Sequence, residues 1–353
     1  MRNRIIKYFI DKAKRNKLIQ SIFEQPINLN KFSVIGSFID SKGNTHKLYE
    51  GFRTKIKPGW ERIFQQDGKI FNKSPQRIRN IVQNGRIAVD RIEPVINLYT
   101  SGIKNIRILE IGCSAGGTSF AFAEKGAVEV IGTEYFAYKL ESLDSAEILQ
   151  TDLNEVDKNL SELRELVRKH FQNTHKISFI DDDICNSGLN HNYFDLICSW
   201  DVLEHLHNPL PAFNNMYQLL KEGGIAIHEY NPFFALNGGH SACTIDFPWG
   251  HVILNKEDFV KFNKEIQPER EDTALSFYLN GINRMTINDL KDYCKQADLE
   301  ILSLIEFPKE QHLRMIDKNI LDLAISNYSS LELKDLITPK IIVVLRKPFA
   351  HNK

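Results

Sequence analysis

A glycine-rich turn follows a short apolar run and is the first place where the sequence could hold a ligand. The run at 106–111 leads into Glu110-Ile-Gly112-Cys-Ser114-Ala-Gly116-Gly117. Ser114 breaks the G-x-G-x-x-G spacing that lets a backbone approach a pyrophosphate, and no Gly-Lys-Ser/Thr ending of a P-loop follows. The pattern therefore predicts a tight turn against a ligand that is not held mainly by its phosphates.

Acidic residues follow the next two apolar runs. Glu134 closes the run at 128–133, where a carboxylate can accept hydrogen bonds from ribose hydroxyls. Three successive aspartates close the run at 177–180, and mutual repulsion argues against all three facing one ligand. Asp183 lies twelve residues before Asp195, and this spacing favours Asp183 as the acceptor for an exocyclic adenine amine. The backbone N–H of Ile184 would then donate to a ring nitrogen.

Seven apolar, β-branched runs alternate with helical patterns and must position these residues. We expect strands at 106–111, 128–133, 177–180, 194–200, 225–230, 300–306 and 341–346, and helices at 118–125, 138–172, 211–220 and 285–297. Thr286 is a good N-cap for the last helix. The alternation predicts βαβ units and a parallel sheet with helices on both faces. The ligand crevice of such a sheet lies outside the carboxyl ends of its strands, where the turn and the acids fall.

The rest of the chain divides into an N-terminal extension at 1–95 and an insertion at 232–284 within a main domain at 96–348. Residues 1–25 have the pattern of a basic amphipathic helix. Such a helix can contact an anionic membrane surface or pack on its own protein, and the second is commoner. Residues 26–95 are mixed, with a helical stretch from about Arg79. The insertion begins where the strand at 225–230 ends, which predicts a lid over the crevice.

The composition is that of a globular protein without a charge bias. The chain has 353 residues, with 45 Lys and Arg against 45 Asp and Glu, so no basic excess points to nucleic acid as a partner. The five cysteines form no CxxC pair and no zinc spacing, which predicts reduced thiols and a cytoplasmic location. No apolar run approaches the ~18 residues that a membrane-spanning helix needs.

The order of the motifs resembles that of the class I S-adenosylmethionine-dependent methyltransferases, and more narrowly their type 11 group. The segments that carry the resemblance are ILEIGCSAGG, VIGTE, FIDDDI, FDLICSWDVLEHL, LLKEGGIAIHEYNPF, MTINDLKDYCKQADLEILSLIEF and KIIVVLRKP. The resemblance implies a Rossmann-like α/β sheet of seven strands whose last strand is antiparallel. It also implies that the chain is an enzyme and that its cofactor is S-adenosylmethionine.

The resemblance further implies which residues contact the cofactor. It assigns Glu110, Gly112 and Gly116 to the methionine moiety, with Ser114 where the family often has glycine. It assigns Glu134 to the ribose, Asp183 and Ile184 to the adenine, and Asp201 to the methionine end near the substrate entrance.

Methyl transfer requires alignment of the acceptor and, for a hydroxyl acceptor, a general base. Imidazole suits this work near neutral pH. His240 and His251 lie in the predicted lid and are the candidate bases, with Asp246 or Asp201 as orienting groups. We therefore predict O-methylation of a small-molecule or glycan-like acceptor, with N- or C-methylation as the alternatives.

Three other interpretations stay open. His228, His240 and His251 could hold a metal ion with Asp246 or Glu229, but their spacings of twelve and eleven match no compact motif, so we predict no metal site. Ser114 disfavours a nicotinamide-dependent reductase. A non-catalytic, membrane-associated binding module could share the fold.

The Asn-Pro-Phe-Phe segment at 231–234 follows the fifth strand and not the fourth, which is the wrong place for the box of base-modifying methyltransferases.

Overall fold

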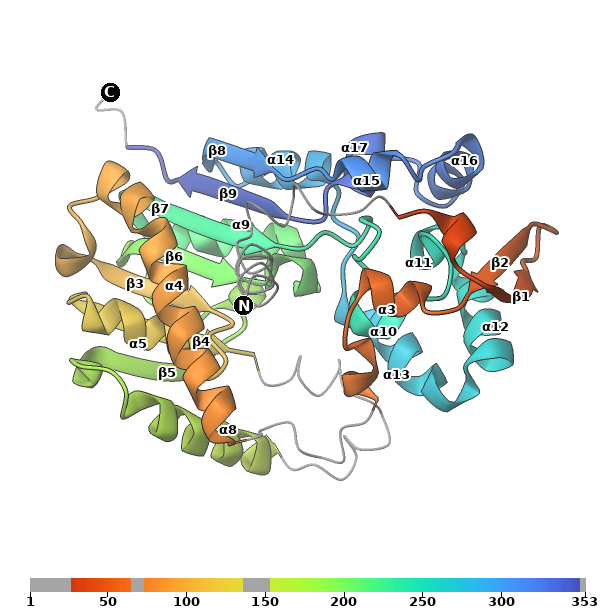
Figure 1. Ribbon diagram of the computed structural model, residues 1–353. Helices are drawn as coiled ribbons and strands as arrows, with labels where there is room; N and C mark the ends of the chain where they lie inside the picture. The colour runs from red at the N-terminus through yellow and green to blue at the C-terminus, as the bar shows by residue number, and fades with distance from the viewer. Residues whose placement is uncertain (1–26, 65–72, 136–152, 350–353) are drawn as a thin grey trace, which may run out of the picture.

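The computed structural model describes residues 27–64, 73–135 and 153–349 (Figure 1). The predicted basic helix at 1–25 lies outside these residues, as does the part of the predicted helix at 138–172 that precedes residue 153. None of the helices in the described ranges is both long enough and apolar enough to cross a membrane.

One seven-stranded sheet forms the centre of the molecule, in the order β5-β4-β3-β6-β7-β9-β8. The five strands β3 to β7 are parallel, and β9 runs antiparallel to both of its neighbours. The strands are β3 (Arg107–Ile111), β4 (Glu129–Glu134), β5 (Ile177–Asp181), β6 (Phe194–Trp200), β7 (Leu220–Tyr230), β8 (Glu300–Glu306) and β9 (Ile341–Arg346). This topology confirms the predicted α/β sheet with its antiparallel last strand.

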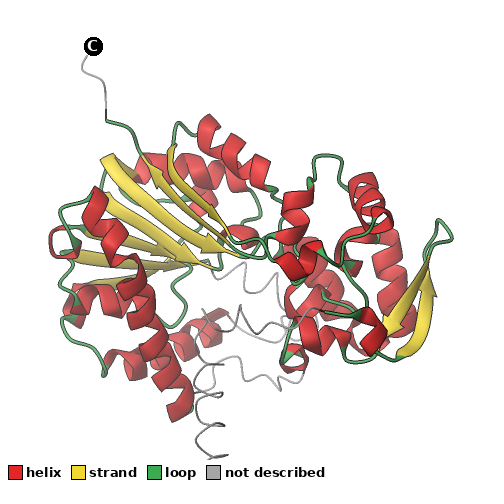
Figure 2. Ribbon diagram, turned by 45° about the horizontal axis from the view of Figure 1, so that its top comes forward, coloured by secondary structure: helices red, strands yellow, loops and turns green. Residues whose placement is uncertain are grey.

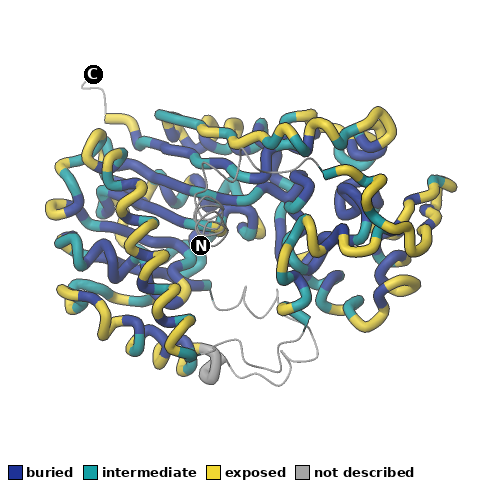
Figure 3. The backbone as a smooth tube through the Cα atoms, viewed as in Figure 1, coloured by how far each residue is buried: buried dark blue, intermediate teal, exposed yellow. Residues whose placement is uncertain are grey.

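Helices cover both faces of the sheet, so its central strands are buried on both sides (Figures 2 and 3). One face carries α4 (Pro75–Tyr99), α5 (Gly117–Glu124) and α8 (Leu153–Arg168), whose apolar side chains pack with Ile108 and Val130. The other carries α9 (Pro209–Leu219) and α14 (Ile287–Gln296), which pack with Leu109 and Val343. Burial on both sides explains why the strands read as continuous apolar runs.

One predicted boundary near the sheet differs from the structure, and one predicted helix cap is confirmed. Strand β7 begins at Leu220 and not at 225, because Gly223 adopts a positive φ of 75° within the strand and lets the chain pass directly from α9 into the sheet. Helix α14 begins after Thr286 as predicted, and Thr286 and Asp289 form a reciprocal capping box.

A second body, here called the cap, lies beyond the carboxyl ends of the parallel strands (Figures 1 and 2). Three chain segments build it: 27–64, the insertion at 232–284, and 310–337. Its elements are η1 (Leu29–Lys31), β1 (Val34–Ile39), β2 (Thr45–Tyr49), α3 (Phe52–Ile56), η2 (Trp60–Ile63), α10 (His240–Cys243), α11 (Gly250–Ile253), α12 (Lys256–Ile266), η7 (Pro268–Arg270), α13 (Glu271–Ser276), the π-helix η8 (Phe277–Gly281), α15 (Glu310–Leu313), α16 (Lys318–Asn327) and α17 (Leu333–Ile337). The insertion is therefore one part of a larger cap.

Arg53 joins the first segment of the cap to the insertion. Its side chain is buried and donates hydrogen bonds to the carbonyl of Ser241 at 2.8 Å and to Oε1 of Gln267 at 2.9 Å. Its guanidinium carbon lies 3.7 Å from the centroid of the Trp60 ring. Burial lowers the pKa of Arg53 to about 10, which leaves the group charged at neutral pH.

Candidate functional site

A pocket opens at the carboxyl edge of the sheet, between the ends of β3, β4, β5 and β6. Its walls are formed by Ile111, Gly112, Glu134, Tyr135, Asp182, Asp183, Ile184, Asp201, Val202, His205, Leu206 and His207. Five predicted cofactor residues are thus brought together at one place: Gly112, Glu134, Asp183, Ile184 and Asp201. Their contact with the cofactor stays a prediction, because the geometry shows only that they surround one space.

The glycine turn is shaped by left-handed backbone at three positions. Gly112, Ser114 and Gly116 have φ values of 67°, 46° and 75°. A Cβ atom on Gly112 would lie 2.5 Å from Cγ2 of Val202, which is another wall of the pocket. Gly112 is therefore required both for its backbone conformation and for the close approach of the loop after β6.

Glu134 and Arg164 hold the turn from two sides. The buried Glu134 carboxylate accepts a hydrogen bond from the Ser114 backbone N–H. Arg164 reaches the turn from α8, and its Nε donates to the Ser114 carbonyl at 2.9 Å while its guanidinium carbon lies 4.1 Å from the Phe179 ring centroid. Sequence analysis missed Arg164, because only the fold shows that this helix runs beneath the turn.

Glu110 supports the turn from the sheet side and does not line the pocket. Its carboxylate lies at the N-terminus of α5, where it accepts a hydrogen bond from Oγ of Ser119. Burial raises the pKa of Glu110 to about 7, while the hydrogen bonds from Ser119 and Thr118 act in the opposite direction. Of the three residues that the resemblance assigns to the methionine moiety, Gly112 lines the pocket wall, whereas Glu110 and Gly116 do not.

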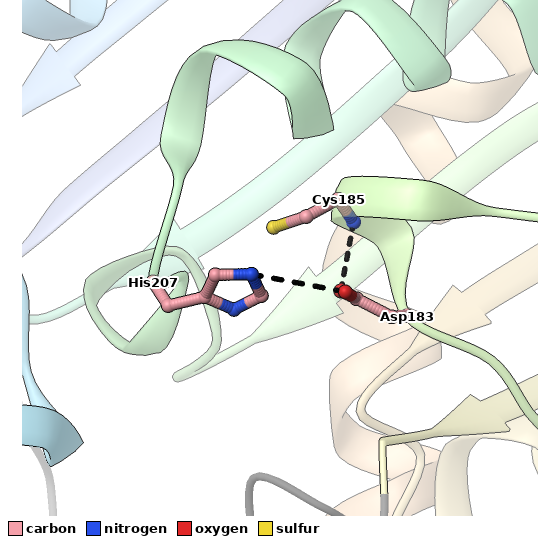
Figure 4. Close-up of side chains that lie close together, drawn as sticks. All are labelled: Asp183, Cys185 and His207. Carbon is pink, nitrogen blue, oxygen red and sulfur yellow. Dashed lines mark hydrogen bonds and ion pairs between the residues drawn. The ribbon is translucent and has the colours of Figure 1, made fainter.

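The predicted adenine end lies where β5 leads into η5 (Ile184–Asn186). Oδ1 of Asp183 accepts a hydrogen bond from the Cys185 backbone N–H at 2.9 Å, and Oδ2 lies 3.8 Å from Nε2 of His207 (Figure 4). One carboxylate oxygen is thus used to fix the loop, while the other faces the histidine across the pocket wall. The buried Ile184 and the ring of Tyr135, 6.1 Å from that of His207 between centroids, provide apolar surface for a flat base.

A second set of polar groups lines the pocket after β6. Asp201 follows β6 with a φ of 54°, and its Oδ1 accepts a hydrogen bond from Nδ2 of Asn231. Burial raises the pKa of Asp201, and the nearby Glu229 carboxylate adds to this shift. His205 ends η6 (Leu203–His205) and donates from Nδ1 to the Gly281 carbonyl at 2.6 Å. The imidazole lone pair of His205 is therefore at Nε2.

The structure gives the predicted catalytic residues different hydrogen-bond partners and surroundings. His240 stays near the pocket, because its ring centroid lies 5.2 Å from that of His205, which is on the wall. His251 is 1% exposed and its Nε2 donates to the Phe233 carbonyl at 2.9 Å, which buries it in the cap core. Asp246 accepts a hydrogen bond from Nε2 of Gln267 at 2.9 Å, so it belongs to the Arg53 cluster.

His228 lies inside β7, as its place in the predicted strand indicated. It is fully buried, its Nδ1 is 2.7 Å from Oγ of Ser199, and burial lowers its pKa to about 3. The three histidines of the metal site considered from the sequence, His228, His240 and His251, therefore do not converge on a common centre within the described residues.

A family model and several solved structures are similar to this chain. A family model described as a methyltransferase domain matches residues 88–304, which is more than half of the chain. A search of curated proteins finds no match. Similar solved structures include a SAM-dependent methyltransferase from Methanosarcina mazei, with 15% identity, a TM-score of 0.44, and coverage of 72% of this chain and 98% of that chain. Another is an S-adenosylmethionine dependent methyltransferase from Mesorhizobium loti, with 15% identity, a TM-score of 0.39, and coverage of 72% and 96%. By its family match and its seven-stranded sheet, the chain belongs to the class I S-adenosylmethionine-dependent methyltransferases.

Proposed function

We propose that this enzyme methylates an oxygen atom of a small-molecule or glycan-like acceptor and that an imidazole removes the acceptor proton. The observation that carries the proposal is the position of His205. It lies on the wall of the pocket that Asp183 and Asp201 also line, with its proton on Nδ1 and its lone pair on Nε2. Burial lowers the pKa of His205, so the neutral, proton-accepting form dominates at physiological pH.

The pocket residues fit the cofactor. Glu134 and Asp183 present carboxylates at the two positions where ribose hydroxyls and the adenine amine would donate, and the Gly112 turn leaves room for the methionine end. S-adenosylmethionine, when bound, supplies a methyl group activated by a positive sulfur. The protein then needs to align the acceptor, exclude water and take up a proton.

The cap supplies the acceptor side of the site. His240 and Phe277 from the insertion lie against His205, with ring centroids 5.2 and 5.9 Å from its own. His240, the base predicted from the sequence, therefore contacts His205. We propose that His205 contacts the acceptor and that His240 positions the His205 ring. Aromatic rings at this end suit the flat face of an aromatic or sugar ring. A cytoplasmic location stays a prediction from the cysteines.

A methyl-transfer screen tests the proposal. The full chain is incubated with S-adenosylmethionine labelled in its methyl group and a set of phenols, carboxylates, sugars and amines, and the methylated atom is identified by NMR. We expect an O-methyl product. His205→Gln should lower kcat by about 10²-fold or more with little change in the KM for the cofactor, whereas the exposed His191→Gln should leave both unchanged. An N- or C-methyl product, or an unaffected kcat in His205→Gln, would overturn the proposal.

A further inference from the structure

Two imidazoles and one carboxylate meet behind the acceptor end of the pocket. Glu204 and His205 come from η6, and His240 begins α10 of the cap. One potential ligand atom from each residue lies within 4.8 Å of the other two. Nε2 of His240 is 3.9 Å from Oε1 of Glu204. The sheet body and the cap thus each contribute to one cluster of metal-binding side chains.

Both imidazoles are oriented by the backbone. Nδ1 of His205 donates to the Gly281 carbonyl, which fixes the ring and leaves the lone pair at Nε2. The His240 imidazole hydrogen-bonds the Asn231 backbone, and its buried Nε2 has no hydrogen-bond partner among the described residues. A histidine that donates one ring N–H to a carbonyl and keeps the other nitrogen for an ion is the usual arrangement at protein metal sites.

The carboxylate has an oxygen without a partner. The Glu204 side chain is 1% exposed, and its Oε1 accepts from the Asn231 backbone N–H at 3.1 Å. Its Oε2 is buried and makes no hydrogen bond within the described part of the chain. Burial and the Asp201 charge raise the pKa of Glu204 to about 8, and the Lys57 ammonium interacts with the same carboxyl group. A bound cation would displace the carboxyl proton and give the buried Oε2 a partner.

We propose that Glu204, His205 and His240 bind a divalent transition-metal ion, with zinc as the best match. Two histidines and one glutamate, with an open fourth position, form a known type of zinc site. Magnesium and calcium prefer sites made of oxygen ligands, so the two imidazoles disfavour them. Bonds of about 2.1 Å to one ion require the ligand atoms to be roughly 3–3.5 Å apart, which small side-chain rotations would achieve.

A second cluster of potential ligands lies at the adenine end and does not compete as a metal site. Asp183, Cys185 and His207 lie close together there (Figure 4). Burial raises the pKa of the Cys185 thiol to about 12, which keeps it protonated, and the thiol donates to the Asn208 carbonyl. Thiolate is the form that binds metal. Asp183 also has a proposed role at the adenine.

Metal binding has a consequence that rests on the proposed function. The ion would take the Nε2 lone pair of His205, which is the atom proposed to accept the proton of the acceptor. The metal and the acceptor proton would then compete for the same nitrogen. Zinc-loaded protein should therefore transfer methyl groups at least about tenfold more slowly than chelator-treated protein, and a chelator should restore the rate.

Cobalt binding tests the site directly, because Co²⁺ adopts zinc sites and gives visible absorption bands. Chelator-treated, untagged full-length protein is titrated with Co²⁺ and then with Zn²⁺. We expect one Co²⁺ per chain, bands that Zn²⁺ abolishes, and at least tenfold weaker binding in Glu204→Gln and His240→Gln. The exposed His191→Gln is the matched control and should bind like the wild type. Circular dichroism melts check that each variant is folded.

Paramagnetic NMR on the wild type makes the test independent of the variants. Co²⁺ should shift the ring N–H signals of two histidines. Absence of stoichiometric Co²⁺ binding, or equal binding by wild type and both folded variants, would overturn the site. Stoichiometric metal binding by a protein that methylates no acceptor would contradict only the proposed function. Methyl transfer that requires zinc would confirm the metal site. It would contradict both the expected inhibition by zinc and the role of His205 as the base.

Discussion

Glu110 is a buried acid whose protonation should control stability near neutral pH. Its carboxyl group has an ordinary pKa of 4.5, and burial within β3 raises this pKa to about 7 in the folded state. The folded chain therefore holds this proton more tightly than the unfolded chain does. The stability that the proton provides is fully present below pH 4.5 and is lost as the pH rises to about 7.

The size of the effect follows from the two pKa values. They differ by about 2.5, and each pH unit corresponds to about 1.4 kcal/mol, so the full effect is about 3 kcal/mol. Glu110→Gln removes the titration and keeps an oxygen that can accept from Ser119. We expect the free energy of unfolding of the variant, relative to wild type, to rise by about 3 kcal/mol between pH 4.5 and about 8.

Urea unfolding at a series of pH values, without cofactor, measures this difference. Other titrating groups are shared by wild type and variant, so they cancel in the comparison. Glu257→Gln, at an exposed position of α12, is the control for removal of a surface carboxyl group. A difference that does not change with pH for Glu110→Gln would show that the folded and unfolded chains bind the Glu110 proton equally, and would refute the reasoning.

Three further substitutions test the site and the cap. Gly112→Ala would place Cβ 2.5 Å from Val202, so calorimetry should show that the variant binds the cofactor product at least about tenfold more weakly. Gly188→Ala is the control, because its added Cβ meets no atom within 4 Å, and it should bind the product normally. Arg164→Met removes the hydrogen bond to the Ser114 carbonyl and should weaken the same binding by about tenfold, and Arg168→Met on the exposed side of α8 should not. Arg53→Met leaves the carbonyls of Ser241 and Ala242 and the Gln267 side chain without their donor, and should lower the free energy of unfolding by about 2–4 kcal/mol in urea. The exposed Lys55→Met should change it by less than about 0.5 kcal/mol. Normal cofactor-product binding in Gly112→Ala or Arg164→Met, or unchanged stability in Arg53→Met, would contradict the corresponding contact.

The sheet was predictable because each of its strands is recognisable from a short, continuous stretch of the sequence. Each central strand is buried on both faces and reads as a continuous apolar run, and the glycine turn and strand-end acids follow these runs directly. Gly112, Glu134 and Asp183 could therefore be found from their distance to a strand end. The carboxyl ends of parallel strands meet at one edge, which brings the three to one pocket.

The cap was not predictable, because its parts are short and distant in sequence. Helices α10 and α11 have four residues each, too few to show a helical period. The segments 27–64, 232–284 and 310–337 form one core only in the fold. The sequence also could not distinguish His240 from His251, because both lie among aromatic and glycine residues. Only the folded structure shows that His251 hydrogen-bonds the Phe233 carbonyl and packs edge-to-face on the Phe233 ring.

Binding of the cofactor product tests the central claim most directly. S-adenosylhomocysteine is titrated calorimetrically into the full chain, with Asp183→Asn and Asp181→Asn beside it and NADH as a second ligand. Asparagine at 183 can still accept from the Cys185 N–H, but its amide would then face the adenine amine with a donor. Asp181 is exposed and does not line the pocket. We expect binding in the micromolar range that Asp183→Asn weakens at least about tenfold and Asp181→Asn leaves unchanged, with no binding of NADH. No binding by folded wild type, or equal binding by both variants, would contradict the assignment of this pocket to S-adenosylmethionine.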